Sequence, residues 1–305
     1  MLDVRKLRLL RELQIRGTVT GVAEALSYSP SSVSQQLSAL EREAGVTLLE
    51  KTGRRVQLTA QGHILVQHTA EILDRLERAE AALSASLTSV TGVVRIAVFQ
   101  SAAHAIVPRA LTILASDYPE LRVEVTERAP EQGLFEVSAR DFDLVIAEQY
   151  PGGTRALPAD LDRIALTSDA IRLATSADPD ARIRTPSLAD AARLPWVMEP
   201  VGTAARTWAT QLCRSAGFEP DVRYETADLI AHIRLVRSGN AVGLLPDLVW
   251  AGEEPPVRLL ELPDAPTRTI FTSARRSSAG RPGVLACRDA LARAVPGALP
   301  IGSKP

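Results

Sequence analysis

The chain has 305 residues, 46% of them apolar, a formal net charge of −1 and two cysteines. This length allows two or three compact units, each with its own core, and so few cysteines argue against a disulfide-held secreted protein. No apolar run approaches the roughly 18 residues that a membrane span requires, so we expect a cytosolic protein with no membrane partner.

A charged helix is expected over 3–16, followed by two short helices joined by a tight turn. Thr20 is a suitable N-cap for the first of these, over 21–27. Ser29 and Pro30 form a cap and first-position pair for the second, which runs to about residue 43 and stops at a glycine.

This second helix has one apolar face and one uncharged polar face. Val33, Leu37 and Leu40 recur at helical spacing and form a stripe that must be buried. Short hydrogen-bonding side chains on the opposite face can approach the floor of a DNA groove. A polar surface helix is the alternative interpretation, but Lys and Glu would be expected on it. The face consists of Ser31, Ser34, Gln35, Ser38 and Arg42.

Two short apolar runs after the helix flank a basic turn, a pattern typical of a β-wing. Residues 1–66 carry nine Lys or Arg against six Asp or Glu, a net charge of +3, so the basic excess is local. A modest excess suits a protein that positions itself through a few phosphate contacts and reads sequence through polar side chains.

Five runs of residues stand in a characteristic order and spacing: Arg5 to Leu7, Gly17 to Leu26, Ser34 to Glu41, Leu48 to Arg54 and Leu58 to Gly62. Through these runs, residues 2–73 resemble the amino-terminal winged helix-turn-helix of the LysR-type transcriptional regulators. Family members commonly carry a Gln and then a Pro after the capping serine, whereas here Pro30 follows Ser29 directly and Ser31 comes next. The Gln that often reaches a base is therefore missing.

The predicted DNA contacts follow from the helix, the wing and this departure. Base contacts are expected from Ser31, Ser34 and Gln35. Contacts to the DNA backbone are expected from Thr20, Ser29, Ser38, Arg42, Lys51, Thr52, Arg54 and Arg55.

Residues 59–87 contain no proline and carry apolar residues at alternating four- and three-residue steps, a heptad pattern. A helix lying on its own domain is the alternative, but a small domain has little core to cover so long a stripe. We predict a homodimer that places two reading heads on an operator of dyad-like symmetry. The LysR resemblance implies the same linker and often a tetramer. The predicted seam is Leu65, Ile72, Leu76, Ala79 and Leu83.

From Val93 onward, short β-rich runs alternate with helical stretches, which argues for a parallel α/β sheet. A first series places strands at 94–98, 121–125 and 143–147 and helices at 102–118 and 131–139. A second series places strands at 170–175, 196–198, 222–224 and 241–245 and helices at 187–192, 203–217 and 228–238. A final strand at 267–273 and helix at 282–295 should return to the first lobe, so that two strands cross between lobes.

This paired-lobe body resembles the regulatory half of LysR proteins, which is similar in fold to type 2 periplasmic binding proteins. The predicted fold class is therefore α+β and multi-domain. Its parts are a winged helix-turn-helix over 1–58, a linker and dimerisation helix over 59–90, effector-binding lobe I over 91–163 with 267–296, effector-binding lobe II over 164–266, and a loose tail over 297–305.

Ligands of open α/β sheets bind beyond the carboxyl ends of strands, where loops lead into helix N-termini. Two such junctions, 99–103 and 198–203, contain hydroxyl residues and free N–H groups suited to a carboxylate or phosphate oxygen, and the LysR resemblance points to the same loops. Ser101 and Thr203 have the alternative role of simple helix caps. Predicted effector contacts are Ser101, Gly202 and Thr203, with Phe99, Gln100, Ala129, Pro130, Trp196, Glu199 and Pro200 as lining.

Glu199 is unusual in this set, because an acid in a pocket is disfavoured unless it meets a cation. We hypothesise that Glu199 holds an ammonium group while the helix ends hold a carboxylate, which would make the effector zwitterionic rather than simply anionic. A Glu turned to solvent explains the sequence equally well.

No phosphate loop, nucleophile elbow or zinc-ligand spacing is present, so we predict no enzyme activity, no cofactor and no metal site. Cys213 and Cys287 fall in apolar helical stretches of different lobes and are expected to be buried free thiols rather than a redox pair.

We therefore predict a LysR-type regulator that binds double-stranded operator DNA and responds to a small-molecule effector, with RNA polymerase as a candidate partner. Effector binding would change the angle between the lobes, provided that the ligand binds the two states unequally. One alternative is an architectural DNA-binding protein with a vestigial cleft. Another is a transport receptor, which would need an export signal and no DNA-binding head.

Overall fold

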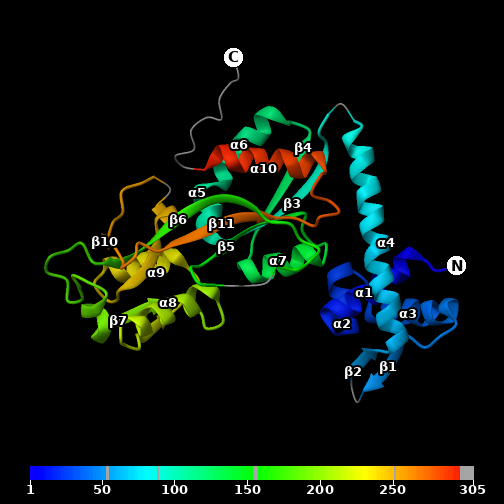
Figure 1. Ribbon diagram of the computed structural model, residues 1–305, viewed down its shortest axis with the longest axis horizontal. Helices are drawn as coiled ribbons and strands as arrows, with labels where there is room; N and C mark the ends of the chain where they lie inside the picture. The colour runs from blue at the N-terminus through cyan, green and yellow to red at the C-terminus, as the bar shows by residue number, and fades with distance from the viewer. Residues whose placement is uncertain (53–54, 88, 154–156, 251, 296–305) are drawn as a thin grey trace. The chain divides into compact units, whose positions relative to one another are not determined.

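The computed structural model describes residues 1–52, 55–87, 89–153, 157–250 and 252–295, and the chain forms two compact units, 1–87 and 88–305 (Figure 1). The first unit combines a three-helix head, a two-stranded wing and one long helix, which confirms the predicted winged helix-turn-helix. Its elements are α1 Val4–Arg16, α2 Val19–Leu26, α3 Pro30–Ala44, β1 Leu49–Thr52, β2 Arg55–Leu58 and α4 Ala60–Ala85.

The start of α2 corrects the predicted cap. Thr18, not Thr20, is the N-cap: its backbone is extended and its hydroxyl accepts a hydrogen bond from the Gly21 N–H at 3.0 Å. Gly17 ends α1 at φ 73°, the backbone is extended at Thr18, and α2 begins at Val19. Thr20 lies exposed in the first turn of the helix.

The start and end of α3 agree with the sequence prediction. The Ser29 hydroxyl accepts from the Ser32 N–H at 3.2 Å, Pro30 occupies the first turn, and Gly45 ends the helix at φ 69°. The stripe of Val33, Leu37 and Leu40 is at most 2% exposed and packs with apolar residues of α1 and α2. Burial of this stripe leaves the uncharged polar face of α3 outside.

Gly62 fixes the junction between the wing and α4. A Cβ at this position would lie 2.3 Å from the backbone oxygen of Leu48, closer than any real contact. We expect Gly62→Ala to lower the free energy of unfolding of the head by about 1–3 kcal/mol or more, as overpacking against backbone does. Circular dichroism during thermal unfolding measures this, with exposed Gln61→Ala as the control. Equal melting of the two variants would contradict the contact.

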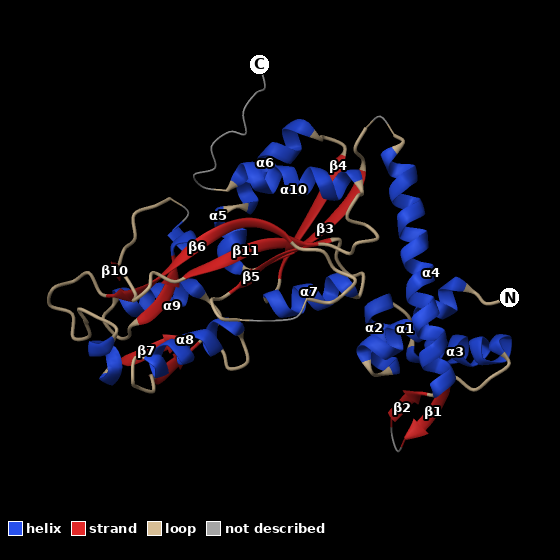
Figure 2. Ribbon diagram, in the orientation of Figure 1, coloured by secondary structure: helices blue, strands red, loops and turns tan. Residues whose placement is uncertain are grey.

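The second unit is built on a mixed sheet (Figure 2). Its strands are β3 Gly92–Val98, β4 Leu121–Glu127, β5 Leu144–Gln149, β6 Ile164–Thr175, β7 Pro195–Met198, β8 Asp221–Glu225, β9 Gly243–Pro246, β10 Arg258–Leu260 and β11 Thr267–Ser273. Its helices are α5 Gln100–Ala105, α6 Val107–Asp117, α7 Pro130–Ser138, α8 Ala204–Ser215, α9 Leu229–Arg237 and α10 Pro282–Ala294, with short 3-10 helices η1 Ala189–Arg193 and η2 Asp247–Trp250.

The strand order is β10-β6-β11-β5-β3-β4, with β9 also paired to β6 and with β7 and β8 in a separate parallel pair. Only β3, β4 and β5 of the large sheet run parallel, while β11 is antiparallel to β5 and β6. The parallel arrangement predicted from the first series of strands is confirmed for β3, β4 and β5. The antiparallel direction of β6 and β11 was not predicted, because a β-rich run carries no signal of its direction. The final strand does return beside β5, as predicted.

Two further differences have local causes. The single helix predicted over 102–118 is two helices, α5 and α6, because Pro108 has no N–H and its ring would clash with the carbonyl of a continuous preceding turn. The sequence did not predict η2 or β10; each is only three or four residues long.

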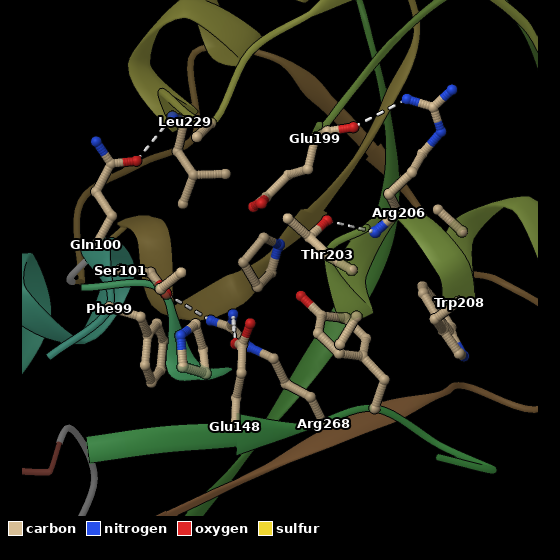
Figure 3. A pocket seen from close by; sticks show the side chains of 18 of the residues that line it. Phe99, Gln100, Ser101, Glu148, Glu199, Thr203, Arg206, Trp208, Leu229 and Arg268 are labelled. Atoms are coloured by element: carbon tan, nitrogen blue, oxygen red, sulfur yellow. Dashed lines mark hydrogen bonds and ion pairs between the residues drawn. The ribbon is translucent and has the colours of Figure 1, made fainter. Parts of the chain in front are cut away.

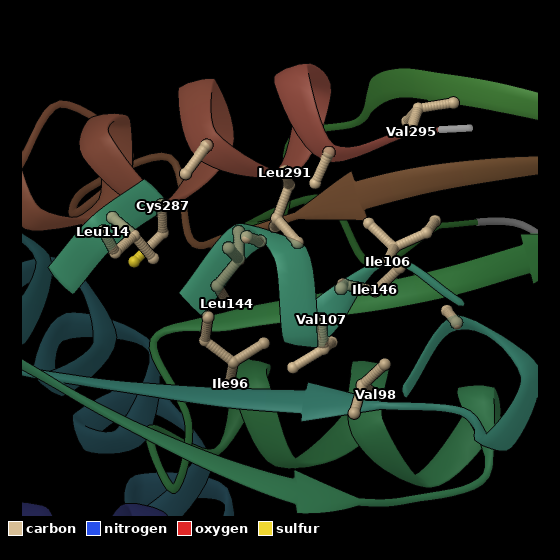
Figure 4. Packing of buried hydrophobic residues seen from close by; sticks show 14 of the residues in the cluster. Ile96, Val98, Ile106, Val107, Leu114, Leu144, Ile146, Cys287, Leu291 and Val295 are labelled. Carbon is tan, nitrogen blue, oxygen red and sulfur yellow. The ribbon is translucent and has the colours of Figure 1, made fainter. Parts of the chain in front are cut away.

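Successive side chains of β3 and β5 point to opposite faces of the sheet, and because they are apolar they form a core on each face. Ile96, Leu144 and Ile146 pack under α5, α6 and α10 (Figure 4), whereas Ala97 and Val145 face α7. Among the described residues no helix is both long and apolar enough to cross a bilayer.

Candidate functional site

The polar face of α3 lies on the surface of the head: Ser31, Ser34, Gln35, Ser38 and Arg42 are all exposed. The hydroxyls of Ser31 and Ser29 hydrogen-bond each other at 3.0 Å, and the Ser34 hydroxyl donates to the Pro30 carbonyl at 3.0 Å. Among the described residues, no hydrogen bond engages the Gln35 amide. Gln35 thus has a free donor and a free acceptor, the pair that a side-chain amide uses on adenine.

The wing is held against α3 by one carboxylate. Glu41 accepts the Leu48 N–H at 2.9 Å and the Leu49 N–H at 3.1 Å, which fixes where β1 begins. Lys51 and Thr52 are exposed on β1. Arg54 lies outside the described residues, and for Arg55 only the backbone, in β2, is described.

The long helix α4 uses two different stripes. Val66, Thr69 and Leu73 are buried, and Val66 belongs to the core of the head. Of the predicted seam, Leu65 packs partly against that core, while Ile72, Leu76 and Leu83 are 38%, 44% and 70% exposed. The exposed part of the heptad stripe is free to meet another apolar surface.

A cavity of about 160 Å³ lies in the second unit where β3, β4, β5 and β7 end and where α5, α7, α8 and α9 begin. The predicted residues that line it are Phe99, Gln100, Ser101, Ala129, Pro130, Glu199 and Thr203. Both predicted junctions therefore meet in one cavity (Figure 3).

Three of the residues predicted at the effector site, one of them a predicted contact and two predicted as lining, do not line this cavity. Trp196 is completely buried in the core and donates its indole N–H to the Ala191 carbonyl at 3.1 Å, because its strand position points inward. Pro200 turns its carbonyl to the N–H and hydroxyl of Thr203. Gly202 borders a second cavity of about 440 Å³ instead.

Arg268 on β11 is the centre of the cavity wall and was not predicted. It is 2% exposed. It donates to Asp169 at 2.7 and 2.9 Å, to the Ser101 hydroxyl at 2.7 Å, and to Glu148. Its guanidinium also lies 5.2 Å from the centre of the Phe99 ring. A lone Arg inside an otherwise uncharged strand was the available signal, since such a charge needs a buried partner.

The polar groups predicted to bind an effector are partly engaged within the protein. The Gln100 side-chain oxygen accepts the Leu229 N–H at 2.8 Å, which joins α5 to the start of α9. Ser101 does not cap a helix but accepts from Arg268, whereas Thr203 is the N-cap of α8, accepting from the Arg206 N–H at 3.1 Å. The N–H groups of Ala204 and Ala205, next to that cap, have no hydrogen-bond partner among the described residues, and both residues line the cavity.

Carboxyl groups dominate the electrostatics of the cavity. Burial first, and then the nearby charge of Glu148, raise the pKa of Glu199 to about 7 against the attraction of Arg268. Burial also raises the pKa of Glu148 and of Asp169, again against the attraction of Arg268. The Arg268 guanidinium thus pairs with Glu148 and Asp169, and it attracts Glu199 without pairing with it.

The two thiols are buried in separate clusters, Cys213 with Trp196 and Cys287 under α6. Burial raises the pKa of each to about 12. Neither thiol is therefore a thiolate near neutral pH.

Comparison with known proteins agrees with both halves of this geometry. Residues 4–63 match the model of the bacterial regulatory helix-turn-helix proteins of the lysR family, and residues 88–296 match the LysR substrate binding domain. The transcriptional dual regulator GltC of Bacillus subtilis (strain 168) is 28% identical over 254 residues, which cover 83% of this chain and 84% of GltC. OxyR of Escherichia coli (strain K12) is 25% identical over 273 residues, 88% of each chain.

Solved structures show the same fold. A full-length OxyR variant from Pseudomonas aeruginosa has a TM-score of 0.68 at 17% identity, over 95% of both chains. CbnR in complex with its target DNA has a TM-score of 0.52 at 21% identity, over 96% of this chain and 99% of CbnR. With its head and its two-lobed body both matched along their length, this chain belongs to the LysR family of transcriptional regulators.

Proposed function

We propose that the protein binds operator DNA of dyad-like symmetry through α3 and the wing, and that a small molecule in the cavity controls this binding. The observation that carries the proposal is the free Gln35 amide on an exposed, uncharged helix face. Ser31 and Ser34 supply further base contacts, and the backbone-contacting residues predicted from the sequence position the helix.

The same proposal includes a dimer, or a tetramer of two dimers, with the exposed stripe of α4 as its seam. Ile72, Leu76 and Leu83 are large apolar side chains on the surface of a long helix. Pairing with a second copy buries them and supplies the second reading head that a dyad-like operator requires.

The effector is proposed to be a small anionic or zwitterionic molecule held between lobe I, residues 91–163 with 267–296, and lobe II, residues 164–266. The N–H groups of Ala204 and Ala205 at the positive end of α8 suit a carboxylate. The bond between Gln100 and Leu229 joins the lobes beside the cavity, so a ligand that displaces or strengthens it changes their angle.

Selection of an operator from random duplexes, followed by titration of variants, tests this function. Gln35→Ala should relax preference at one base pair of each half-site by about 1–3 kcal/mol. Lys51→Ala should weaken binding to every duplex and reduce the slope of affinity against salt by about 1.

Gln67→Ala is the matched control, an exposed glutamine on α4 away from the reading face. If Gln35→Ala weakens all duplexes equally, α3 does not read bases. Binding to many unrelated sites with no response to any small molecule would favour an architectural protein.

A further inference from the structure

The cationic side chains around the cavity are directed to protein partners. Arg268 is engaged by Asp169, Glu148 and Ser101. Arg128 pairs with Glu136 at 2.9 Å, and Arg206 pairs with Glu225 at 3.1 Å. The arginines that line the cavity are therefore already neutralised by carboxylates.

The Glu199 carboxyl, in contrast, has no hydrogen bond or ion pair among the described residues. Figure 3 shows it pointing into the cavity, while its backbone oxygen accepts from Arg206 at 2.9 Å on the other side. The charged groups that act on Glu199 are Glu148 on β5, Glu131 on α7 and Arg268 on β11. Two of these three are acidic, and the single cation among them, Arg268, is paired with Glu148 and Asp169 rather than with Glu199.

His232 on α9 gives independent evidence, because one of its ring nitrogens lacks a hydrogen-bond donor. The ring is 2% exposed and lines the cavity, and its Nε2 lies 2.8 Å from the Thr226 carbonyl oxygen. Because a carbonyl only accepts, Nε2 carries the proton and Nδ1 is a bare acceptor. Nδ1 is buried without a partner in the described structure, and buried acceptors are seldom left unsatisfied. Burial lowers the pKa of His232, so the ring is neutral and does not supply the missing charge.

We propose that the cavity binds the primary ammonium group of an effector, held by Glu199, Glu148 and Nδ1 of His232. A primary ammonium has three donors and no acceptor, which complements three acceptors. The effector is then an amine or a zwitterion whose carboxylate lies at the start of α8, and a simple anion is rejected by Glu199 and Glu148. This inference rests on the proposed function, since it names the chemistry of the ligand in the same cavity.

Four probes of one chain length test the inference on the full-length protein: pentylammonium, 5-aminopentanoate, pentanoate and pentanol. Calorimetry and thermal shift should show that the two ammonium probes bind and raise Tm, while pentanoate and pentanol do not. Glu199→Gln should weaken both ammonium probes by about tenfold or more, as loss of a charged hydrogen bond does. Glu127→Gln is the control, since Glu127 lines the same cavity but is exposed, and it should change the affinity little.

Three results would each overturn the ammonium site. Pentanoate could bind as tightly as pentylammonium, or the affinity for the ammonium probes could be unchanged by Glu199→Gln. The third is that no probe binds more tightly than pentanol. Operator binding is measured by fluorescence anisotropy on the same preparations. If the protein binds its operator but does not prefer the ammonium probes, the ammonium site alone is contradicted. Absence of any selected operator counts against the proposed function.

Discussion

Arg268→Met should lower the free energy of unfolding of the second unit by about 3–5 kcal/mol, because it leaves Glu148 and Asp169 buried without their cation. The side chains of Arg268, Glu148 and Asp169 are 3%, 9% and 5% exposed, so water cannot replace the guanidinium. Urea unfolding followed by tryptophan fluorescence measures this, since all three tryptophans lie in the second unit.

Arg223→Met is the matched control for this variant. Arg223 pairs with Asp221 at 2.7 Å, but both side chains are about half exposed, so its loss should change stability by less than about 1 kcal/mol. Adding Asp169→Asn to Arg268→Met should recover part of the loss by removing one buried charge. Equal effects of Arg268→Met and Arg223→Met would show that the Arg268 cluster is solvated.

Glu199→Gln should raise the free energy of unfolding at pH 8 and leave it unchanged near pH 4. The pKa of Glu199 is about 7 in the folded protein against an ordinary value of 4.5, so folding favours the protonated form. The cost of ionising Glu199 therefore appears as the pH rises above 4.5 and is complete above 7. A difference of this size corresponds to about 3 kcal/mol, an upper limit for a group that borders a cavity.

Urea unfolding of wild type and Glu199→Gln at a series of pH values measures this difference. Glu127→Gln, exposed on the cavity rim, should follow the wild-type curve at every pH. A Glu199→Gln curve parallel to wild type from pH 4 to 8 would mean that Glu199 faces solvent, the alternative that the sequence left open.

The head could be predicted almost entirely from the sequence because its signals are local. The Ser29 cap, the stripe on α3 and the glycine stop at residue 45 all act within one helix. The cap of α2 was predicted two residues late because both Thr18 and Thr20 are good N-caps. Only the left-handed turn at Gly17 chooses between them.

The cavity was predicted in part, because helix starts are visible in the sequence but side-chain direction and long-range pairing are not. Phe99, Ser101 and Thr203 follow from strand-to-helix junctions. Arg268 is separated in sequence from Ser101 by 167 residues and from Asp169 by 99. No local sequence pattern predicts contacts between residues so far apart in the chain. The error at Trp196 has the same cause, because neighbouring side chains of β7 point to opposite faces, one into the core and the next into the cavity.

Control of the reading head by the cavity is tested most directly by one titration. Affinity of the full-length protein for its selected operator is measured by fluorescence anisotropy while 5-aminopentanoate is added. The expected result is a shift of operator affinity in the wild type, and the same shift in Glu199→Gln only at about tenfold or more higher probe concentration. An operator complex that the ammonium probe leaves unchanged, although calorimetry shows the probe bound, would contradict coupling between cavity and DNA.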